Sequence, residues 1–205
     1  GRNQLQGISV VYSNASGNLF SVHLLKYYVS NIILVKDDGS EFKLNNYDLI
    51  NAFDANYSNA NASNVPNGTY TSMKFFIGVD SLRNHTGAQE GDLDPANNMF
   101  WSWSTGYVFF KHEGSFKDSS NNIQPLLFHL GNDRALSAIQ IPVSLIVNGE
   151  DKFMNINFDI TKMYNAPLIN FNFDNNHMST SVADSIWINN MIANMNDVFS
   201  FESVQ

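Results

Sequence analysis

Two tryptophans near the middle of the chain are the residues most suited to chemistry. Trp101 and Trp103 form a Trp-x-Trp pair, and Met99 precedes them by two residues. Side chains alternate between the two faces of a β-strand, so these three would share one face. Aromatic faces can stack on a ligand, and a methionine sulfur suits Cu(I). The same residue types also serve as core or rim packing, and methionine commonly fills gaps between apolar side chains.

The loop before this strand is acidic. It carries Glu90, Asp92 and Asp94 at alternate positions. Carboxylate oxygens are the ligands that Ca²⁺ prefers, so the loop is a candidate calcium site. Acidic loops of this kind are more often simply solvated, and that alternative stays open.

The histidines are scattered rather than grouped. None forms His-x-His or His-x-x-x-His, so a zinc motif is absent. His129 lies among apolar residues, whereas His177 follows a polar turn. A buried histidine normally donates to a backbone carbonyl, but imidazole is also a common metal ligand. A site assembled from distant strands therefore stays open. The five histidines are His23, His85, His112, His129 and His177.

The composition excludes several classes of function. The chain has no cysteine, which rules out disulfides, thiolate metal sites and cysteine nucleophiles. A net charge of −8 and a pI near 4.9 argue against nucleic-acid binding, which relies on clustered Lys and Arg. No apolar run reaches the roughly 18 residues that span a membrane. Phosphate-binding glycine loops and the Gly-x-Ser-x-Gly motif are absent, so we do not expect an enzyme.

Hydrophobic alternation predicts about ten strands. Asp37-Asp-Gly-Ser40 and Asn148-Gly149 have the composition of hairpin turns. Tyr47–Phe53 is expected to form a helical turn or a loop crossing, and Val182–Val198 is the one segment with helical spacing. The predicted strands are Gln4–Tyr12, Leu19–Lys36 (two strands or one bent strand), Glu41–Leu44, Thr69–Val79, the tryptophan strand, Gln124–Leu130, Ala135–Val147, Lys152–Ile160, Leu168–Phe173 and Phe199–Val204.

These elements predict the fold class. Many short strands with turn signals between them are typical of an all-β fold. We expect an antiparallel β-sandwich with Greek-key-like crossings and one helix near the C-terminus. No repeat or linker divides the chain, so we expect a single domain over residues 1–205.

A longer pattern surrounds the tryptophan pair and covers most of the chain. Its central part comprises Gly78-Val-Asp80, Gly91-Asp-Leu-Asp-Pro95, Met99-Phe-Trp-Ser-Trp103, Gly106-Tyr107 and Lys111-His-Glu-Gly114. Its outer parts are Lys26-Tyr-Tyr-Val-Ser-Asn-Ile32, Phe128-His-Leu-Gly131 and His177-Met178. In this order the segments resemble the MbnP-like copper-binding domain family.

The resemblance implies a bacterial protein of the periplasm or outer membrane that binds copper. It implies a site near Trp101 or Trp103, with His129 and His177 as imidazole ligands. Met99 is a further candidate because its sulfur suits Cu(I). Some members of this family are encoded beside a dihaem peroxidase-like enzyme that oxidises a tryptophan of its partner to kynurenine. One of the two tryptophans is therefore a candidate for that modification.

We therefore expect an extracytoplasmic protein that captures or buffers copper. Two other classes of protein remain open. In a carbohydrate-binding module, Trp101, Trp103 and Tyr107 would form an exposed platform for stacking sugars. In a structural cell-surface domain, the tryptophans would lie in the core. Burial of these side chains distinguishes the three.

Overall fold

The main sheet is built around one long strand, β2 (Leu19–Lys36). The structure is a computed structural model that describes residues 11–102, 104–165, 169–180 and 185–205. The other strands of the main sheet are β1 (Val11–Ser13), β3 (Glu41–Lys43), β4 (Tyr47–Asn51), β5 (Gly68–Ile77), β6 (Phe100–Ser102), β7 (Gly106–Lys117), β8 (Ile123–Gly131), β9 (Ser137–Val147) and β11 (Met178–Ser179). A second sheet contains β10 (Met154–Phe158) and β12 (Phe199–Val204). The α-helices are α1 (Ser81–Asn84), α2 (Ile160–Asn165) and α3 (Ser185–Met195).

Strand β2 pairs along both of its edges. One edge pairs with β7 along the first half of β2 and with β5 along the second half. The other edge pairs in turn with β1, β4 and β3. Followed from each strand to its hydrogen-bonded neighbour, the path through the sheet is β11-β8-β7-β2-β5-β9, and among the described residues only the β8–β11 pairing is parallel. Neither β5 nor β7 follows β2 directly in the sequence. The chain passes through β3 and β4 before it reaches β5, and through α1 and β6 before it reaches β7.

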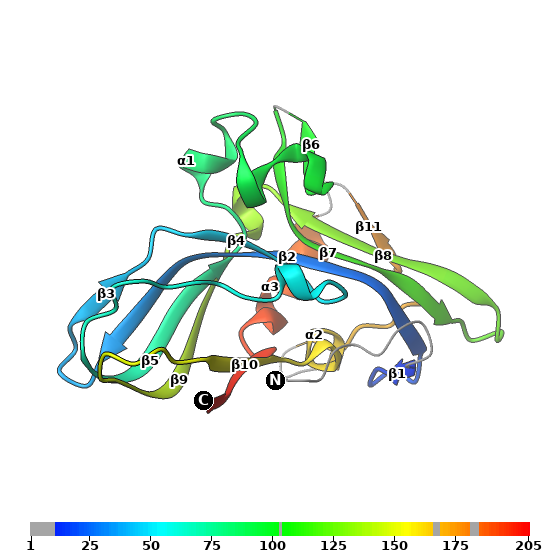
Figure 1. Ribbon diagram of the computed structural model, residues 1–205. Helices are drawn as coiled ribbons and strands as arrows, with labels where there is room; N and C mark the ends of the chain where they lie inside the picture. The colour runs from blue at the N-terminus through cyan, green and yellow to red at the C-terminus, as the bar shows by residue number, and fades with distance from the viewer. Residues whose placement is uncertain (1–10, 103, 166–168, 181–184) are drawn as a thin grey trace.

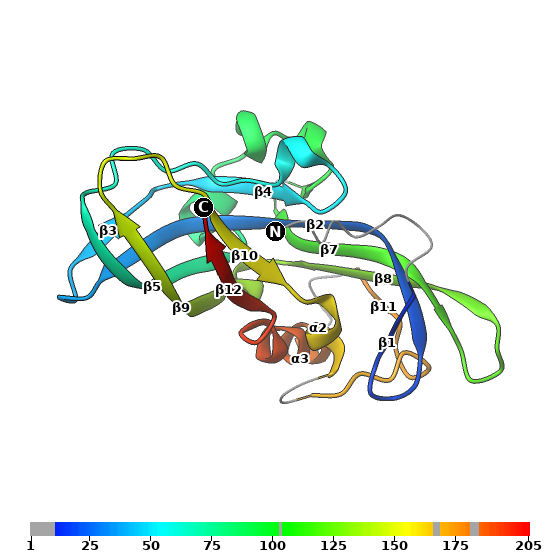
Figure 2. The same ribbon diagram turned by 60° about the horizontal axis from the view of Figure 1, so that its bottom comes forward.

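The main sheet arches over the C-terminal part of the chain (Figure 1). Helices α2 and α3 and strand β10 lie under its concave face, and β12 runs beside β10 (Figure 2). Tyr27 of β2 stacks on Phe158 of β10, with ring centroids 5.2 Å apart. Phe75 of β5 meets Phe199 of β12 edge-to-face, also at 5.2 Å. Apolar side chains thus fill the space between two layers, which makes the fold an all-β sandwich.

A second aromatic cluster lies under β7 and β8. Phe128 of β8 packs against Tyr164 of α2 and Trp187 of α3. Phe20 of β2 meets Tyr164 and Phe173 edge-to-face. This cluster holds both helices to the concave face. Within the described ranges, no helix is both long and apolar enough to cross a membrane.

The convex face carries the insertion between β5 and β7, which includes α1 and β6 (Figure 1). Two buried tyrosines anchor this insertion to the sheet. The Tyr28 hydroxyl donates to the Asp92 carbonyl oxygen at 3.0 Å, and the Tyr107 hydroxyl donates to the Leu93 carbonyl oxygen at 2.7 Å. The two tyrosine rings meet edge-to-face at 5.8 Å. The acidic loop and the tryptophan strand are therefore fixed to the centre of the sheet.

The strand pairing differs from the sequence prediction in two places. Asn148-Gly149 forms a bend and does not close a hairpin, because β9 pairs with β5 and β10 pairs with β12. The chain passes from one layer to the other at this point. Tyr47–Phe53 is neither a helical turn nor a loop crossing over its first five residues, because these form β4 and pair with β2. In contrast, the Asp37–Ser40 hairpin is confirmed, because β3 folds back on β2 beyond it.

The C-terminal third also differs in its elements. Residues 169–173 of the predicted strand Leu168–Phe173 are irregular, and Phe171 and Phe173 are fully buried. Their alternation reflects burial in the aromatic cluster rather than sheet pairing. The predicted late helix is present as α3, which ends at Met195 rather than at Val198. Helix α2 was not predicted, because its six residues are too few to display a helical period and its first residue, Ile160, was assigned to the predicted strand Lys152–Ile160.

Candidate functional site

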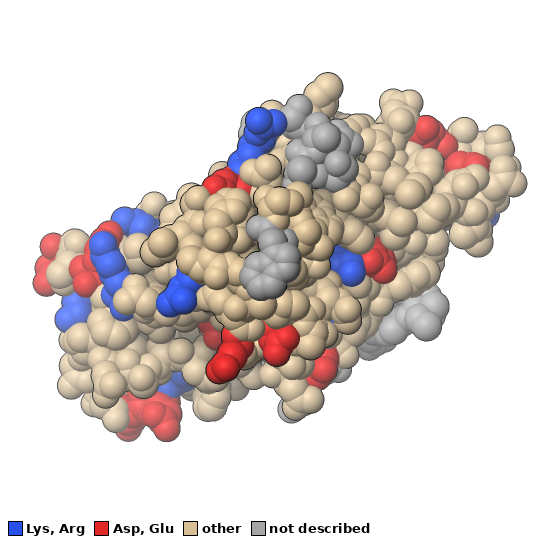
Figure 3. All heavy atoms as spheres, turned by 90° about the horizontal axis from the view of Figure 1, so that it is seen from above, with Lys and Arg blue, Asp and Glu red and all other residues tan. Residues whose placement is uncertain are grey.

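The alternation of side chains along β7 and β8 creates two faces with different chemistry. His112 of β7 and Phe128 of β8 are opposite each other and lie in the core beneath the sheet. Lys111 and His129, which are also opposite each other, lie on the convex face. Figure 3 looks onto this face, where acidic and basic side chains are interspersed over a mostly uncharged surface.

A chain of polar contacts crosses the convex face. His129 Nε2 lies 2.9 Å from Glu113 Oε1, and Lys111 Nζ lies 3.3 Å from the same carboxylate oxygen. Lys111 also reaches the Asn98 carbonyl oxygen at 3.5 Å, and the neighbouring Lys26 donates to the Asn97 carbonyl oxygen at 3.1 Å. These contacts connect His129 to the backbone just before the tryptophan strand.

The protonation of this cluster follows from burial and charge. Burial lowers the pKa of His129, and Lys111 lowers it further, whereas Glu113 opposes the shift. The imidazole is therefore neutral at neutral pH. If its Nε2–H donates to Glu113, Nδ1 carries a free lone pair. Burial also lowers the pKa of Lys26, and the like charge of Lys111 adds to that shift.

Trp101 packs on β8 two residues beyond His129. A Cβ atom built at Gly131 would come within 2.5 Å of Trp101 Cζ3, so the indole ring lies directly on Gly131. Gly131 follows His129 by two residues in β8, and residues two apart share a face of a strand. Trp101 is partly buried and packs against the core. Trp103, its predicted companion, lies outside the described residues.

The structure does not bring His177 together with His129. The His177 ring lies 5.2 Å from the Phe116 ring, and its Nδ1 lies 3.3 Å from the Phe173 carbonyl oxygen. Phe116 belongs to the buried aromatic cluster on the concave side. The two imidazoles therefore lie on opposite faces of the sheet. Met99 is fully buried, which places its thioether in the core beneath the insertion.

The acidic loop uses its carboxylates to hold backbone amides. Asp92 Oδ2 accepts from the Leu49 N–H at 2.8 Å, and Asp94 Oδ1 accepts from the Ala96 N–H at 2.8 Å. Glu90 precedes a 3₁₀ turn without capping it through its side chain. Within the described ranges, no group of three or more His, Asp or Glu side chains stands close enough to hold a metal ion.

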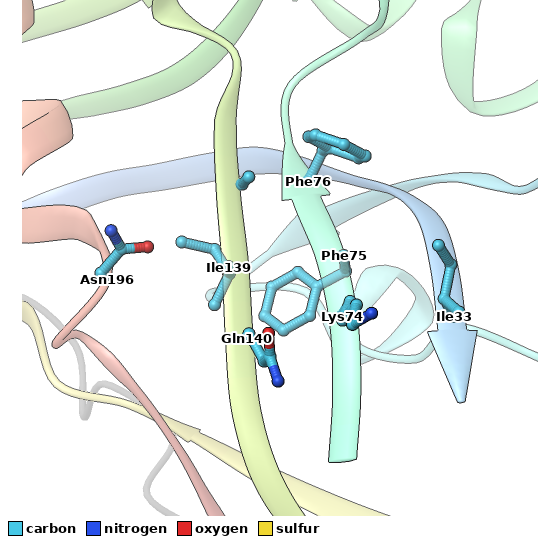
Figure 4. A pocket seen from close by; sticks show the side chains of 8 residues that line it. Ile33, Lys74, Phe75, Phe76, Ile139, Gln140 and Asn196 are labelled. Carbon is cyan, nitrogen blue, oxygen red and sulfur yellow. The ribbon is translucent and has the colours of Figure 1, made fainter. Parts of the chain in front are cut away.

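Two other places on the protein are less suitable as sites. Tyr107 is fully buried, so it cannot belong to an exposed platform for sugars. A shallow hollow of about 400 Å³ opens between β2, β5 and β9 (Figure 4). Its charged group, Lys74, is paired with Glu41 at 2.8 Å, and the described residues of its lining include no His or carboxylate. The lining residues are Ile33, Lys74, Phe75, Phe76, Ala138, Ile139, Gln140 and Asn196.

Glu113 and Gly131 were not predicted as parts of the site. Glu113 lies in the segment Lys111-His-Glu-Gly114, which belongs to the pattern that resembles the family. Its contact with His129 depends on how β7 pairs with β8. Residues two apart in a strand share a face, so Lys111 lies with Glu113 and His129 lies with Gly131. The pairing of β7 with β8 is needed to show that all four residues share one face.

Comparison with known proteins identifies the family. The family profile of MbnP matches residues 2–183, which is most of the chain. Among solved structures, MbnP from Methylosinus trichosporium is similar, with 15% sequence identity and a TM-score of 0.49. The alignment covers 80% of this chain and 77% of that chain. No curated protein matches. On the match to the family profile, the chain belongs to the MbnP family.

Proposed function

We propose that the protein binds copper on the convex face of its main sheet, with His129 as an imidazole ligand and Trp101 beside it. One observation carries this proposal: the indole of Trp101 and the imidazole of His129 lie on the same face of β8. Glu113 accepts from His129, and carboxylates commonly orient a metal-bound histidine in this way. A neutral imidazole is an appropriate ligand for copper in either oxidation state.

Trp101 contributes differently before and after oxidation. The indole N–H is only a hydrogen-bond donor, so an intact tryptophan lines the site without binding the metal. Kynurenine carries an aromatic amine and a ketone, which can approach the metal. We propose that Trp101 or Trp103 is converted to kynurenine by a dihaem peroxidase-like partner.

The conversion balances with hydrogen peroxide as the oxidant. Two molecules of peroxide, activated by the haem of the partner, cleave the indole C2–C3 bond and add two oxygen atoms, and two water molecules form. Hydrolysis of the resulting N-formyl group releases formate and leaves the free amine. Cysteine is absent from the chain, and a protein without thiols suits the extracytoplasmic location that we propose. There the protein would capture or buffer copper rather than act as an enzyme.

Copper titration of variants tests the site. We expect His129→Ala to weaken Cu(I) binding at least tenfold, about 1.4 kcal/mol. His85→Ala is the control, because the exposed His85 ring is paired with Asp133 at 3.1 Å rather than with Glu113, and its loss should leave the affinity unchanged. An unchanged affinity in His129→Ala would overturn the proposal. A tenfold loss in His177→Ala alone would move the site to the concave face.

A further inference from the structure

Two Asn-Gly pairs meet at one end of the β5–β9 pairing. Asn67-Gly68 leads into β5, and Asn148-Gly149 follows β9. Gly68 pairs with Val147, so the two pairs lie at the same end of these strands. Asparagine is a thermolabile residue. A following glycine has no Cβ and leaves the asparagine side chain open to attack by the next backbone nitrogen. Both pairs are therefore candidates for deamidation, and the structure distinguishes them.

The contacts of the Asn148 amide favour this reaction. Asn148 is exposed and lies in a bend. Its Oδ1 accepts from the Glu150 N–H at 3.4 Å, and its Nδ2 donates to Glu150 Oε2 at 3.2 Å. A backbone N–H at Oδ1 stabilises the negative charge that develops on this oxygen when a nucleophile attacks Cγ. Among the described residues the Gly149 N–H has no hydrogen-bond acceptor, so this nitrogen is free to be the nucleophile.

The surroundings of Gly149 leave room for a ring to close. No atom lies within 4 Å of its Cβ position. Lys152 Nζ lies 2.9 Å from Glu150 Oε2, the same oxygen that accepts from Asn148 Nδ2. An ammonium group and the nitrogen that leaves as ammonia therefore share one carboxylate oxygen. This arrangement puts a proton donor beside the leaving group.

The second pair, Asn67-Gly68, is held in place by its neighbours. Gly68 is the first residue of β5 and pairs with Val147 of β9. The Lys36 side chain covers it, because a Cβ atom built at Gly68 would come within 2.9 Å of Lys36 Cε. Lys36 Nζ also donates to the Asn67 carbonyl oxygen at 2.9 Å. Ring closure at Asn67 therefore requires the end of the strand to open and Lys36 to withdraw.

We propose that Asn148 is a site of spontaneous deamidation and that the fold protects Asn67, which has the same sequence motif. The Gly149 nitrogen loses its proton to solvent and attacks Asn148 Cγ. A C–N bond forms, and the Cγ–Nδ2 bond breaks to release ammonia. Water then opens the resulting succinimide at either of its carbonyl groups, which gives aspartate or isoaspartate. The product carries a new negative charge beside Glu150, and isoaspartate adds a main-chain carbon where the chain passes between the layers.

Peptide mass spectrometry of the folded protein, incubated in mildly alkaline buffer, tests the inference. Trypsin separates the two sites, because Asn67 lies in the peptide Leu44–Lys74 and Asn148 in Ala135–Lys152. We expect deamidation to be roughly tenfold faster at Asn148, because Asn67 reacts only after local opening of the strand end. Equal rates, or a faster rate at Asn67, would overturn the proposal. In urea the two rates should become equal, and a difference that persists there would show that the fold does not protect Asn67.

A substitution at Glu150 tests the role of the backbone donor. Glu150→Pro removes the N–H that donates to Asn148 Oδ1, and it should slow deamidation about threefold, the effect of losing one exposed hydrogen bond. Glu150→Ala is the matched control, because it loses the same carboxylate and keeps the N–H. The difference in rate between the two variants measures the contribution of the N–H. Equal rates would show that this group does not assist the reaction.

Discussion

Trp101 lies so close to Gly131 that no side chain fits between them. A Cβ atom at Gly131 would come within 2.5 Å of Trp101 Cζ3 and 2.6 Å of the Tyr107 carbonyl oxygen. Glycine is required here by the close approach of two groups. On one face of β8, His129 therefore presents its imidazole and Gly131 leaves the space in which the Trp101 indole packs.

We predict that Gly131→Ala displaces the indole ring. The added methyl group would overpack a position bounded on one side by backbone, at a cost of about 1–3 kcal/mol in the free energy of unfolding. Chemical denaturation measures that cost, and the tryptophan emission spectrum of the folded variant should shift as Trp101 moves. Gly149→Ala is the control for the emission measurement alone, because no atom lies within 4 Å of its Cβ position while its φ of +91° strains an alanine placed there. Emission identical to that of the unaltered protein would contradict the contact.

Asn84→Ala should destabilise the protein through a different mechanism. Asn84 is 1% exposed, and its Oδ1 accepts from the Tyr107 N–H at 2.8 Å. Its Nδ2 donates to Asp133 Oδ1 at 2.9 Å. Removing the amide leaves a buried N–H without an acceptor, which costs about 1–3 kcal/mol in the free energy of unfolding. The exposed Asn148→Ala should cost less than about 0.5 kcal/mol in the same denaturation experiment, and equal effects would argue against this role.

Much of the fold could be predicted because alternation is a local property of the sequence. The final strand β12 alternates apolar and polar residues, the long β2 strand is rich in Val, Ile, Leu and Tyr, and Asp-Gly marks the hairpin at Asp37–Ser40. Pairing between distant strands is not local, and it depends on which faces become buried. Asn148-Gly149 illustrates the limit, because a good turn sequence cannot show that the next strand joins another layer. Phe171 and Phe173 illustrate it again, because a buried irregular segment alternates like a strand.

The candidate site shows the same limit. The sequence identified Trp101 and His129 separately, but their proximity depends on the pairing of β7 with β8. His177 was grouped with His129 by resemblance, and the structure separates them because His177 lies on the opposite face of the sheet.

Glu113→Gln should weaken copper binding without unfolding the protein. Glutamine keeps an oxygen acceptor for His129 but loses the charge that orients the imidazole, and such changes typically cost 10-fold or more in metal affinity, here expected to be about tenfold. Cu(I) titration against a competing chelator measures the change. Glu150→Gln is the matched control, because Glu150 pairs with Lys152 in an exposed turn at 2.9 Å. If both variants bind Cu(I) equally well, Glu113 does not orient the ligand.

His112 differs from the other histidines because it is fully buried in the aromatic cluster. Its Nδ1 is hydrogen-bonded to the Tyr164 hydroxyl, and within the described part of the chain its Nε2 has no hydrogen-bond partner. Burial lowers the pKa of His112 from 6.5 to about 3, with His23 and His129 adding to the shift and the Ser21 backbone opposing it. The folded protein therefore holds this imidazole neutral across the acidic range.

This difference predicts a loss of stability as the pH falls. The unfolded chain takes up a proton on His112 as the pH falls through 6.5, whereas the folded protein resists protonation down to about 3. The stabilisation is complete above pH 6.5 and is lost progressively below it, by about 2 kcal/mol between pH 7 and pH 5. Urea denaturation of the unaltered protein and of His112→Gln measures the difference in pH dependence, which should be steeper in the unaltered protein by that amount. The exposed His85→Gln is the control for general effects of acid, and equal slopes in His112→Gln and the unaltered protein would show that His112 is protonated alike in both states.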